Sequence, residues 1–381
     1  MDNELFGPQR VLWPPGSETQ TERRSRYLGC LLGGAVGDAL GAPVEFLSRS
    51  SILAQFGPEG ITDYAPAYGR LGAITDDTQM TLFTAEGLLR SHVRDVYKGI
   101  TTREGLTANA YLRWLHTQGM PTPLDERGQN SGWLIRHPAL HSRRAPGNTC
   151  LSALAELRGI KPANNHSKGC GGVMRVAPAG LYGLSYGMAT PQQVFELAAN
   201  LAQLTHGHPS GYLSAGLLGV MVMALADGAQ IETALEAGLS LLVTHEGHEE
   251  TRLAIEKARE LAAAGSDPVV AIGQLGQGWV AEEALAIAVY CSLVADSFEH
   301  GVVLSVNHDG DSDSTGAITG HILGTQYGVE AIPSRWLGSL ELREVIAEIA
   351  EDLLVYPDWP IGEDSPDEAL SERIWDKYPG F

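Results

Sequence analysis

Basic residues are scarce in this 381-residue sequence, which contains 26 lysines and arginines against 46 aspartates and glutamates. The formal net charge of −20 argues against binding to nucleic acids or anionic membranes, because both require a basic surface. It does not exclude anionic ligands, since a bound divalent cation reverses the charge locally.

Cysteines are also few, and the four of them form no CxxC pair. This scatter is typical of a reducing compartment and argues against a disulfide framework or a structural zinc site. The first ten residues are polar, and no apolar run reaches the roughly 18 residues of a membrane span. We therefore expect a cytoplasmic protein.

Alternation of apolar and polar residues, typical of strands, is rare in the sequence, whereas helical periodicity is frequent. We predict an all-α fold: a single helical domain over residues 27–355, an extended arm over residues 1–26 and a tail over residues 356–381. The tail carries loop and at most a short helix. The expected helices cover residues 78–90, 107–116, 150–158, 191–204, 212–225, 231–242, 249–264, 282–297, 314–323 and 340–354.

Glycines recur at every fourth position early in the expected domain, at Gly29, Gly33, Gly37 and Gly41. This spacing places them on one face of a helix. A face without side chains lets a second helix approach closely, although glycine lowers helix propensity. We therefore expect close helix packing at this face.

The segment 307–320, NHDGDSDSTGAITG, places Asp309, Asp311 and Asp313 at alternate positions before Ser314. Three carboxylates this close repel one another unless a cation lies between them. Carboxylate and hydroxyl oxygens are the preferred ligands of Mg²⁺, Mn²⁺ and Ca²⁺. An acidic turn that caps a helix is equally consistent, because Asp and Ser are favoured N-caps. This segment alone favours neither interpretation.

A second acidic segment, ITDDT, places Thr75, Asp76 and Asp77 directly before an apolar-periodic helix. One of these carboxylates would suffice to cap the helix and interact with its dipole. The doubled carboxylate therefore favours a ligand role. Together, the two acidic segments could hold two divalent cations.

Two further segments contain candidate ligand contacts. The glycines of NNHSKGCGGVMR, residues 164–175, would let backbone amides approach a ligand, although a structural turn is the alternative. His206 lies between two helical stretches, where a lone histidine is more often a cap or a packed core residue. The HEGH stretch at 245–248 has its histidines three residues apart rather than four, which argues against a zinc protease.

Taken together, these stretches resemble the ADP-ribosylglycohydrolase family, the enzymes related to dinitrogenase reductase-activating glycohydrolase. They occur in the family's order and cover about residues 27–354. The matching pieces are GCLLGGAVGDALGAPVEF at 29–46, ITDDTQMTLFTAEGLL at 74–89, SKGCGGVMRVAPAGL at 167–181, LTHGHP at 204–209, GWVAEEALAIAVYC at 278–291 and GDSDSTGAITGHILG at 310–324.

The resemblance implies a binuclear Mg²⁺ or Mn²⁺ centre at the base of a cleft in an all-α fold. The metal ligands that it implies are Thr75, Asp76, Asp77, Asp311, Asp313 and Ser314. The implied catalytic candidates are Asp76, Asp77, Asp311 and Glu45, and the implied substrate contacts are Ser167, Lys168, Gly169, Cys170 and His206. Asp309 lies outside the family's pattern. Lys168 and Cys170 stand where many relatives have other residues.

The resemblance also implies a hydrolase that removes ADP-ribose from modified proteins, with arginine as the favoured linkage and serine- or poly-ADP-ribose as alternatives. Such an enzyme could serve as an immunity protein against an ADP-ribosyltransferase toxin. A second hypothesis is a binding protein that blocks an ADP-ribosyltransferase through residues 1–26. This arm carries apolar anchors, including Trp13, and is alternatively a disordered tail or a strap on its own domain.

Overall fold

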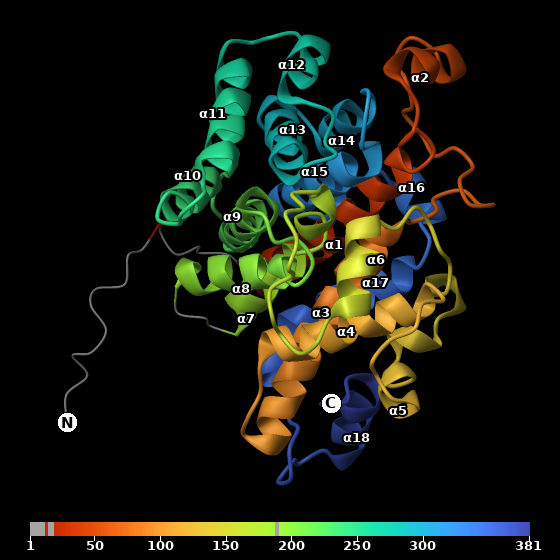
Figure 1. Cartoon of the computed structure of the whole chain (residues 1–381), viewed down its shortest axis with the longest axis vertical. Helices are drawn as coiled ribbons and strands as arrows, with labels where there is room; N and C mark the ends of the chain where they lie inside the picture. The colour runs from red at the N-terminus through yellow and green to blue at the C-terminus, as the bar shows by residue number, and fades with distance from the viewer. Residues whose placement is uncertain (1–11, 14–18, 187–189) are drawn as a thin grey trace.

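The computed structural model describes residues 12–13, 19–186 and 190–381 of the chain. Within these residues the regular structure is helical, and pairing of the β type is limited to two isolated bridges. Figure 1 shows the helices packed together, with α14 and α15 from late in the chain lying against α1 from its beginning. The predicted all-α fold is confirmed.

The centre of the fold is a contact between α1 (Gln20–Gly41) and α15 (Ser312–Tyr327), which run antiparallel with their backbones touching. A methyl group on Gly37 would lie 1.9 Å from the carbonyl oxygen of Gly316, far inside a normal contact distance. The same close approach repeats at Gly29 with Gly324, Gly33 with Gly320 and Gly41 with Ser312. We call this contact the glycine seam; it confirms the expected close packing at the glycine face.

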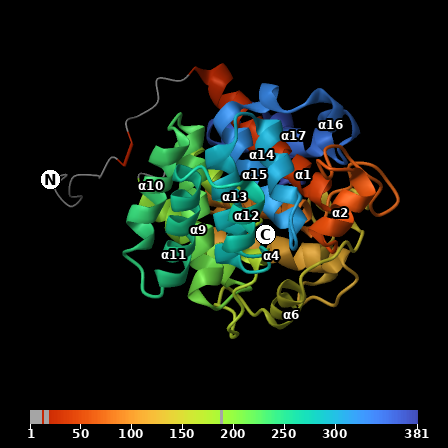
Figure 2. The same ribbon diagram turned by 90° about the horizontal axis from the view of Figure 1, so that it is seen from above.

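Three further helices complete the interior around the seam: α3 (Asp76–Lys98), α9 (Pro209–Ala226) and α13 (Ala281–Val294). Figure 2 shows α1, α13 and α15 gathered in the middle of the molecule. By length and composition α9 is apolar enough to cross a membrane, so our expectation that no run reaches that length was wrong. Because 89% of α9 is buried inside the protein, it is typical of a core helix.

The remaining helices surround this interior. They are α2 (Arg49–Phe56), α4 (Arg103–Thr117), α5 (Glu126–Gln129), α6 (Asn148–Glu156), α7 (Ala177–Ser185), α8 (Pro191–Gln203), α10 (Ile231–Leu242), α11 (Glu249–Ala263), α12 (Pro268–Leu275), α14 (Phe298–Val306), α16 (Ser334–Ser339), α17 (Arg343–Val355) and α18 (Glu368–Lys377). Each range predicted to be helical falls on one of the helices, with ends that differ by four residues or fewer except at the end of α3, which continues to Lys98 rather than ending at residue 90. The helices that sequence periodicity missed are mostly short, such as α2, α12 and α16.

The first helix begins earlier than expected. Thr19 and Glu22 form a reciprocal capping box, so α1 starts at Gln20 and residues 20–26 are helical rather than part of an extended arm. Trp13 is buried, and its indole nitrogen donates a hydrogen bond to Asp227 Oδ2 at 3.0 Å. The arm is therefore held against its own domain at this point. Residues 1–11 and 14–18 lie outside the described residues.

Candidate active site and metal centre

Asp38 fixes the start of α3. It is fully buried on α1, and its carboxylate accepts hydrogen bonds from the backbone amides of Thr75 and Thr78 at 3.0 and 3.1 Å. The Thr78 hydroxyl donates to the same oxygen. Burial raises the pKa of Asp38 to about 6, although these hydrogen bonds oppose the shift. The first turn of α3, with Asp76 and Asp77, is thus anchored to α1.

Sequence reasoning did not single out Asp38 as a site residue. The sequence does mark this residue, because Asp38 is the single charged residue between Tyr27 and Gly41 in an otherwise apolar, glycine-rich stretch. A charged side chain on a buried helix needs several hydrogen-bond donors. The chain provides these donors at the N-terminus of α3, which the sequence alone did not place beside α1.

The glycine seam brings the start of α15 to the same place. A methyl group on Gly41 would lie 2.3 Å from the carbonyl oxygen of Ser312, so the end of α1 touches the beginning of α15. Asp311 is the N-cap of α15, and Asp313 Oδ1 accepts a hydrogen bond from the Ser314 amide at 3.0 Å. The capping interpretation of this segment therefore holds, and it leaves other carboxylate oxygens of the two aspartates available.

The two acidic segments meet at Ser314. Its hydroxyl lies 3.0 Å from both carboxylate oxygens of Asp77. The side chains of Asp76 and Asp77 are buried, as are those of Asp311 and Asp313. The structure therefore brings together two segments that are more than 200 residues apart in the chain.

Glu45 joins this cluster from the loop that follows α1. One oxygen each from Glu45, Asp311 and Asp313 lie within 4.8 Å of one another. Glu45 Oε2 is buried and has no hydrogen-bond partner among the described residues. Burial, followed by the charges of Asp311 and Asp76, raises the pKa of Glu45 to about 9. We refer to Glu45, Asp76, Asp77, Asp311 and Asp313 as the acidic cluster.

The electrostatics of the acidic cluster favour a bound cation. Burial is the largest cause that raises the pKa values of Asp76, Asp77 and Asp313 well above their usual range, and neighbouring carboxylates raise them further. A divalent cation would relieve both effects at once. The donors are oxygens, as Mg²⁺ and Mn²⁺ prefer, and Glu45 offers a buried oxygen without a partner. The residues present therefore fit a metal centre.

The acidic cluster forms the floor of a cleft with a volume of about 580 Å³, which is large enough for a small-molecule ligand. Its walls come from the loop before α6, the glycine-containing loop around Cys170 and the loop before α13. Of the predicted site residues, those that line the cleft are Glu45, Asp76, Asp77, Gly169, Cys170, His206, Asp311, Asp313 and Ser314.

Three predicted site residues do not line this cleft. Thr75 is fully buried, and its hydroxyl accepts a hydrogen bond from the Asp77 amide at 3.3 Å, so it caps α3. The ammonium group of Lys168 forms ion pairs with Glu282 and with Glu250, the latter at 2.8 Å. The hydroxyl of Ser167 lies 3.0 Å from the Thr149 hydroxyl. The Lys168 side chain is therefore engaged with α11 and α13.

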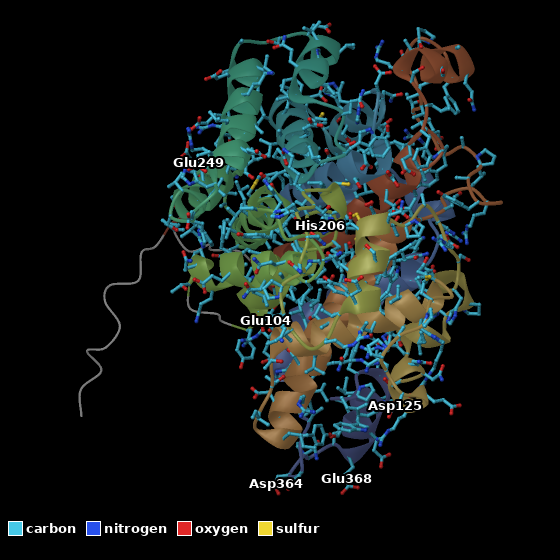
Figure 3. All side chains as sticks on the ribbon, viewed as in Figure 1. Glu104, Asp125, His206, Glu249, Asp364 and Glu368 are labelled. Carbon is cyan, nitrogen blue, oxygen red and sulfur yellow. The ribbon has the colours of Figure 1, made fainter. Side chains whose placement is uncertain are left out.

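His206 lies beneath the glycine-containing loop. A methyl group on Gly171 would lie 3.1 Å from the His206 ring, and one on Gly169 would lie 3.3 Å from it. Burial, together with the nearby charge of Arg175, lowers the pKa of His206 to about 3, so the ring is neutral. Figure 3 shows His206 in the interior of the view, whereas the labelled Glu249 and Glu368 lie at the periphery. His206 thus supports the loop as well as lining the cleft.

Two aromatic residues at the cleft were missed by sequence reasoning. Phe46 follows Glu45, and Trp279 precedes α13; both side chains are exposed and both line the cleft. Their ring centroids are 6.0 Å apart with an interplanar angle of 19°, which is a stacked arrangement. Their signal in the sequence was weak, because a single aromatic residue in a loop has no periodicity.

Comparison with known proteins supports one family. A model of the ADP-ribosylglycohydrolase family matches residues 19–360. The chain is 27% identical over 323 residues to an ADP-ribosyl-[dinitrogen reductase] glycohydrolase from Rhodospirillum rubrum, covering 84% of this chain and 91% of that protein. It is 26% identical over 352 residues to the ADP-ribosylarginine hydrolase Tri1 from Serratia proteamaculans, covering 91% of this chain and 83% of that protein.

A solved structure described as an ADP-ribosylglycohydrolase-related protein complex is also similar. It aligns with a TM-score of 0.57 and 27% sequence identity, covering 88% of this chain and 99% of the solved chain. The alignment therefore extends over nearly all of the helical domain.

Proposed function

Because the chain belongs to the ADP-ribosylglycohydrolase family, we propose that it is a hydrolase that uses Mg²⁺ or Mn²⁺ to remove ADP-ribose from modified protein side chains. The observation that carries this proposal is the acidic cluster, five buried carboxylates from three separate parts of the chain on the floor of one cleft. Such crowding is unfavourable without bound cations, and it offers the oxygen donors that these cations prefer.

The proposed roles follow from the positions of the side chains. Asp76, Asp77, Asp311, Asp313 and Ser314 would hold the cations. Bound there, two divalent cations would orient the ribose hydroxyls of the substrate and increase the acidity of a water molecule. The anomeric carbon gains positive charge as its bond to the protein side chain breaks. The carboxylates on the cleft floor would stabilise that charge.

A carboxylate of the acidic cluster would take up the proton of the attacking water. Glu45 is the favoured base because its Oε2 is buried without a partner, whereas both oxygens of Asp77 lie near the Ser314 hydroxyl. Asp76, Asp77 and Asp311 are the alternatives. Replacing Glu45 by Gln removes the base while keeping the size and shape of the side chain.

Arginine is the linkage that we favour. It is supported by the similarity over most of the chain to a protein named ADP-ribosylarginine hydrolase. The same similarity motivates a role as an immunity protein that reverses the action of an ADP-ribosyltransferase. Serine- and poly-ADP-ribose remain alternative substrates.

Release of ADP-ribose from arginine-modified and serine-modified proteins tests this proposal. With Mg²⁺ or Mn²⁺ present we expect release from the arginine-modified protein, and chelation of the cations should abolish it. Release from the serine-modified protein alone would reassign the linkage. No release from either protein, while the cations bind, would contradict hydrolysis.

The second hypothesis from the sequence, a protein that blocks an ADP-ribosyltransferase through its arm, stays a prediction. Trp13 is engaged with Asp227 of the chain's own domain, which favours a strap at that point. Deleting residues 1–12 separates the two functions. ADP-ribose release should persist in the shortened protein, whereas a blocking function through the arm should be lost.

A further inference from the structure

Cys170 places a sulfur atom directly against the acidic cluster. Its Sγ lies 2.8 Å from Asp311 Oδ2 and 3.6 Å from the Ser314 hydroxyl oxygen. Among the four cysteines, Cys30, Cys150 and Cys291 are buried, while Cys170 is partly exposed within the cleft. Cys150 borders the same cleft but is buried, so Cys170 is the partly exposed cysteine that lies beside a carboxylate there.

Asp311 has two chemically different sets of neighbours. Glu45 and Asp313 offer only oxygen atoms, within 4.8 Å of an Asp311 oxygen and of one another. The sulfur of Cys170 contacts Asp311 Oδ2, and the hydroxyl of Ser314 lies near both this sulfur and Asp77. The proposed centre is therefore chemically asymmetric about Asp311.

A second observation, independent of the cysteine, indicates that the acidic cluster beside Cys170 receives a ligand. Glu45 Oε2 is buried without a hydrogen-bond partner among the described residues, and its carboxylate faces Asp311 and Asp313. A buried carboxylate oxygen without a donor is unfavourable unless a cation or a ligand satisfies it.

We propose that Cys170 makes one half of the centre a mixed oxygen–sulfur site that accepts a thiophilic divalent cation such as Zn²⁺, with Asp311 as the carboxylate shared with the all-oxygen half. Sulfur is a soft ligand that selects Zn²⁺ over Mg²⁺ or Mn²⁺, and the affinity order of divalent metals also places Zn²⁺ above Mn²⁺. The cation takes the place of the thiol proton, which leaves to solvent.

The inference rests on the metal centre of the proposed function and adds a regulatory consequence. Zn²⁺ held through Cys170 would compete with the Mg²⁺ or Mn²⁺ used for hydrolysis. A protein with an oxygen donor in place of the Cys170 sulfur would lack this competition from Zn²⁺. Zn²⁺ should therefore inhibit the wild-type protein at concentrations at least about tenfold lower than it inhibits Cys170→Ser, since losing a group that supports a bound metal costs this much affinity or more.

Cadmium provides a direct readout that does not depend on activity, because a cadmium–sulfur bond gives an ultraviolet charge-transfer absorption. We expect this absorption in the full wild-type chain, with saturation at one Cd²⁺ per chain. Cys170→Ser should lose it and keep the stabilisation against heat that Mg²⁺ provides. Cys150→Ser is the matched control, because Cys150 borders the same cleft but is buried against Arg175, and it should keep the absorption.

The outcomes separate this inference from the proposed function. An absorption that persists in Cys170→Ser, or its absence from the wild type while Mg²⁺ still stabilises the protein, would overturn the sulfur site and leave the metal centre intact. If neither Mg²⁺ nor Cd²⁺ binds, the metal centre itself is wrong. Cys170→Ala serves as the second variant if Cys170→Ser does not fold, and it should give the same loss.

Discussion

Helices α3 and α11 both begin with two acidic residues, yet their environments are opposite. Asp76 and Asp77 at the start of α3 are 5% and 2% exposed. The side chains of Glu249 and Glu250 at the start of α11 are 63% and 52% exposed, and Figure 3 shows Glu249 at the edge of the molecule. A helix N-terminus favours carboxylates in both places, so the helix dipole does not account for the difference.

The surroundings of the two helix starts explain this difference in exposure. The start of α3 is covered by Asp38 and by the beginning of α15, so burial and like charges raise the pKa values of Asp76 and Asp77. Glu250 instead accepts hydrogen bonds from Lys168 and Ser210, which lower its pKa. Acidic residues at the start of a helix thus indicate a metal site when other carboxylates pack against them. They indicate a solvated cap when a lysine pairs with them.

The largest expected effect is the loss of hydrolysis when the acidic cluster loses one of its carboxylates. Asp311→Asn removes the carboxylate that lies near Glu45, Asp313 and the Cys170 sulfur. We expect ADP-ribose release to fall by about 10²- to 10³-fold, the loss typical of removing one group that stabilises charge in a transition state. Steady-state release of ADP-ribose with saturating Mg²⁺ measures this change.

Two controls belong to this experiment. Asp309 is exposed and accepts a hydrogen bond from the Arg49 amide at 2.7 Å, outside the cleft, so Asp309→Asn should leave release unchanged. Glu249→Gln at the start of α11 should also have no effect. Equal losses in Asp309→Asn and Asp311→Asn would contradict the contrast between buried and solvated carboxylates.

A substitution in the glycine seam should have the next largest effect, because the close contact between α1 and α15 brings the acidic residues together. In Gly37→Ala the new methyl group would lie 1.9 Å from a backbone oxygen of α15, which cannot move aside as a flexible side chain can. We expect a loss of about 3 kcal/mol in the free energy of unfolding, the upper part of the usual range for overpacking. Urea unfolding measures it.

Gly273→Ala is the matched control, because nothing lies within 4 Å of the methyl group that it adds to α12. Alanine is the better helix former by up to about 1 kcal/mol, so this variant should be as stable as the wild type or more stable. A Gly37→Ala protein of wild-type stability would show that α1 and α15 are not in backbone contact.

Divalent cations should stabilise the protein through the buried acidic residues alone. At a cation concentration about 100 times the dissociation constant, binding adds about 2.7 kcal/mol to the free energy of unfolding. Asp77→Asn should lose most of this gain, whereas Glu250→Gln should retain it. Thermal unfolding with Mg²⁺ and with a chelator compares them, and an equal gain in both variants would contradict the assignment of the site.

A smaller effect per pH unit is expected in the metal-free protein. The pKa of Glu45 is raised from 4.5 to about 9, so between these values the folded state holds a proton that the unfolded state releases. Stability should therefore fall as pH rises through this window, by up to about 1.4 kcal/mol per pH unit for one proton. Unfolding at a series of pH values in the presence of a chelator measures the slope.

Glu45→Gln should reduce this slope, and saturating Mg²⁺ should flatten it. Glu250→Gln is the comparison from α11. The pKa of Glu250 is lowered, so its effect on stability lies at acidic pH. The slope of stability against pH at higher pH should therefore not change in this variant. A wild-type slope in Glu45→Gln would show that Glu45 does not contribute to this titration.

The sequence predicted features that are local or repeated. The glycine spacing predicted the seam because a period of four fixes one face of a helix, and helical periodicity predicted the longer helices. The acidic segments admitted two interpretations, and capping by Asp311 is present in the structure alongside its contact with Cys170. The packing of Asp38 beneath α3, and the ion pairs that engage Lys168, depend on contacts between distant segments, which no local pattern records.

The most direct test of the metal centre is anomalous X-ray scattering from crystals of the full chain grown with Mn²⁺ and ADP-ribose. We expect manganese peaks at the carboxylates of Asp77, Asp311 and Asp313, with the ribose of ADP-ribose in the cleft above them. Peaks only at exposed carboxylates such as Glu249, or ADP-ribose bound away from the acidic cluster, would contradict it.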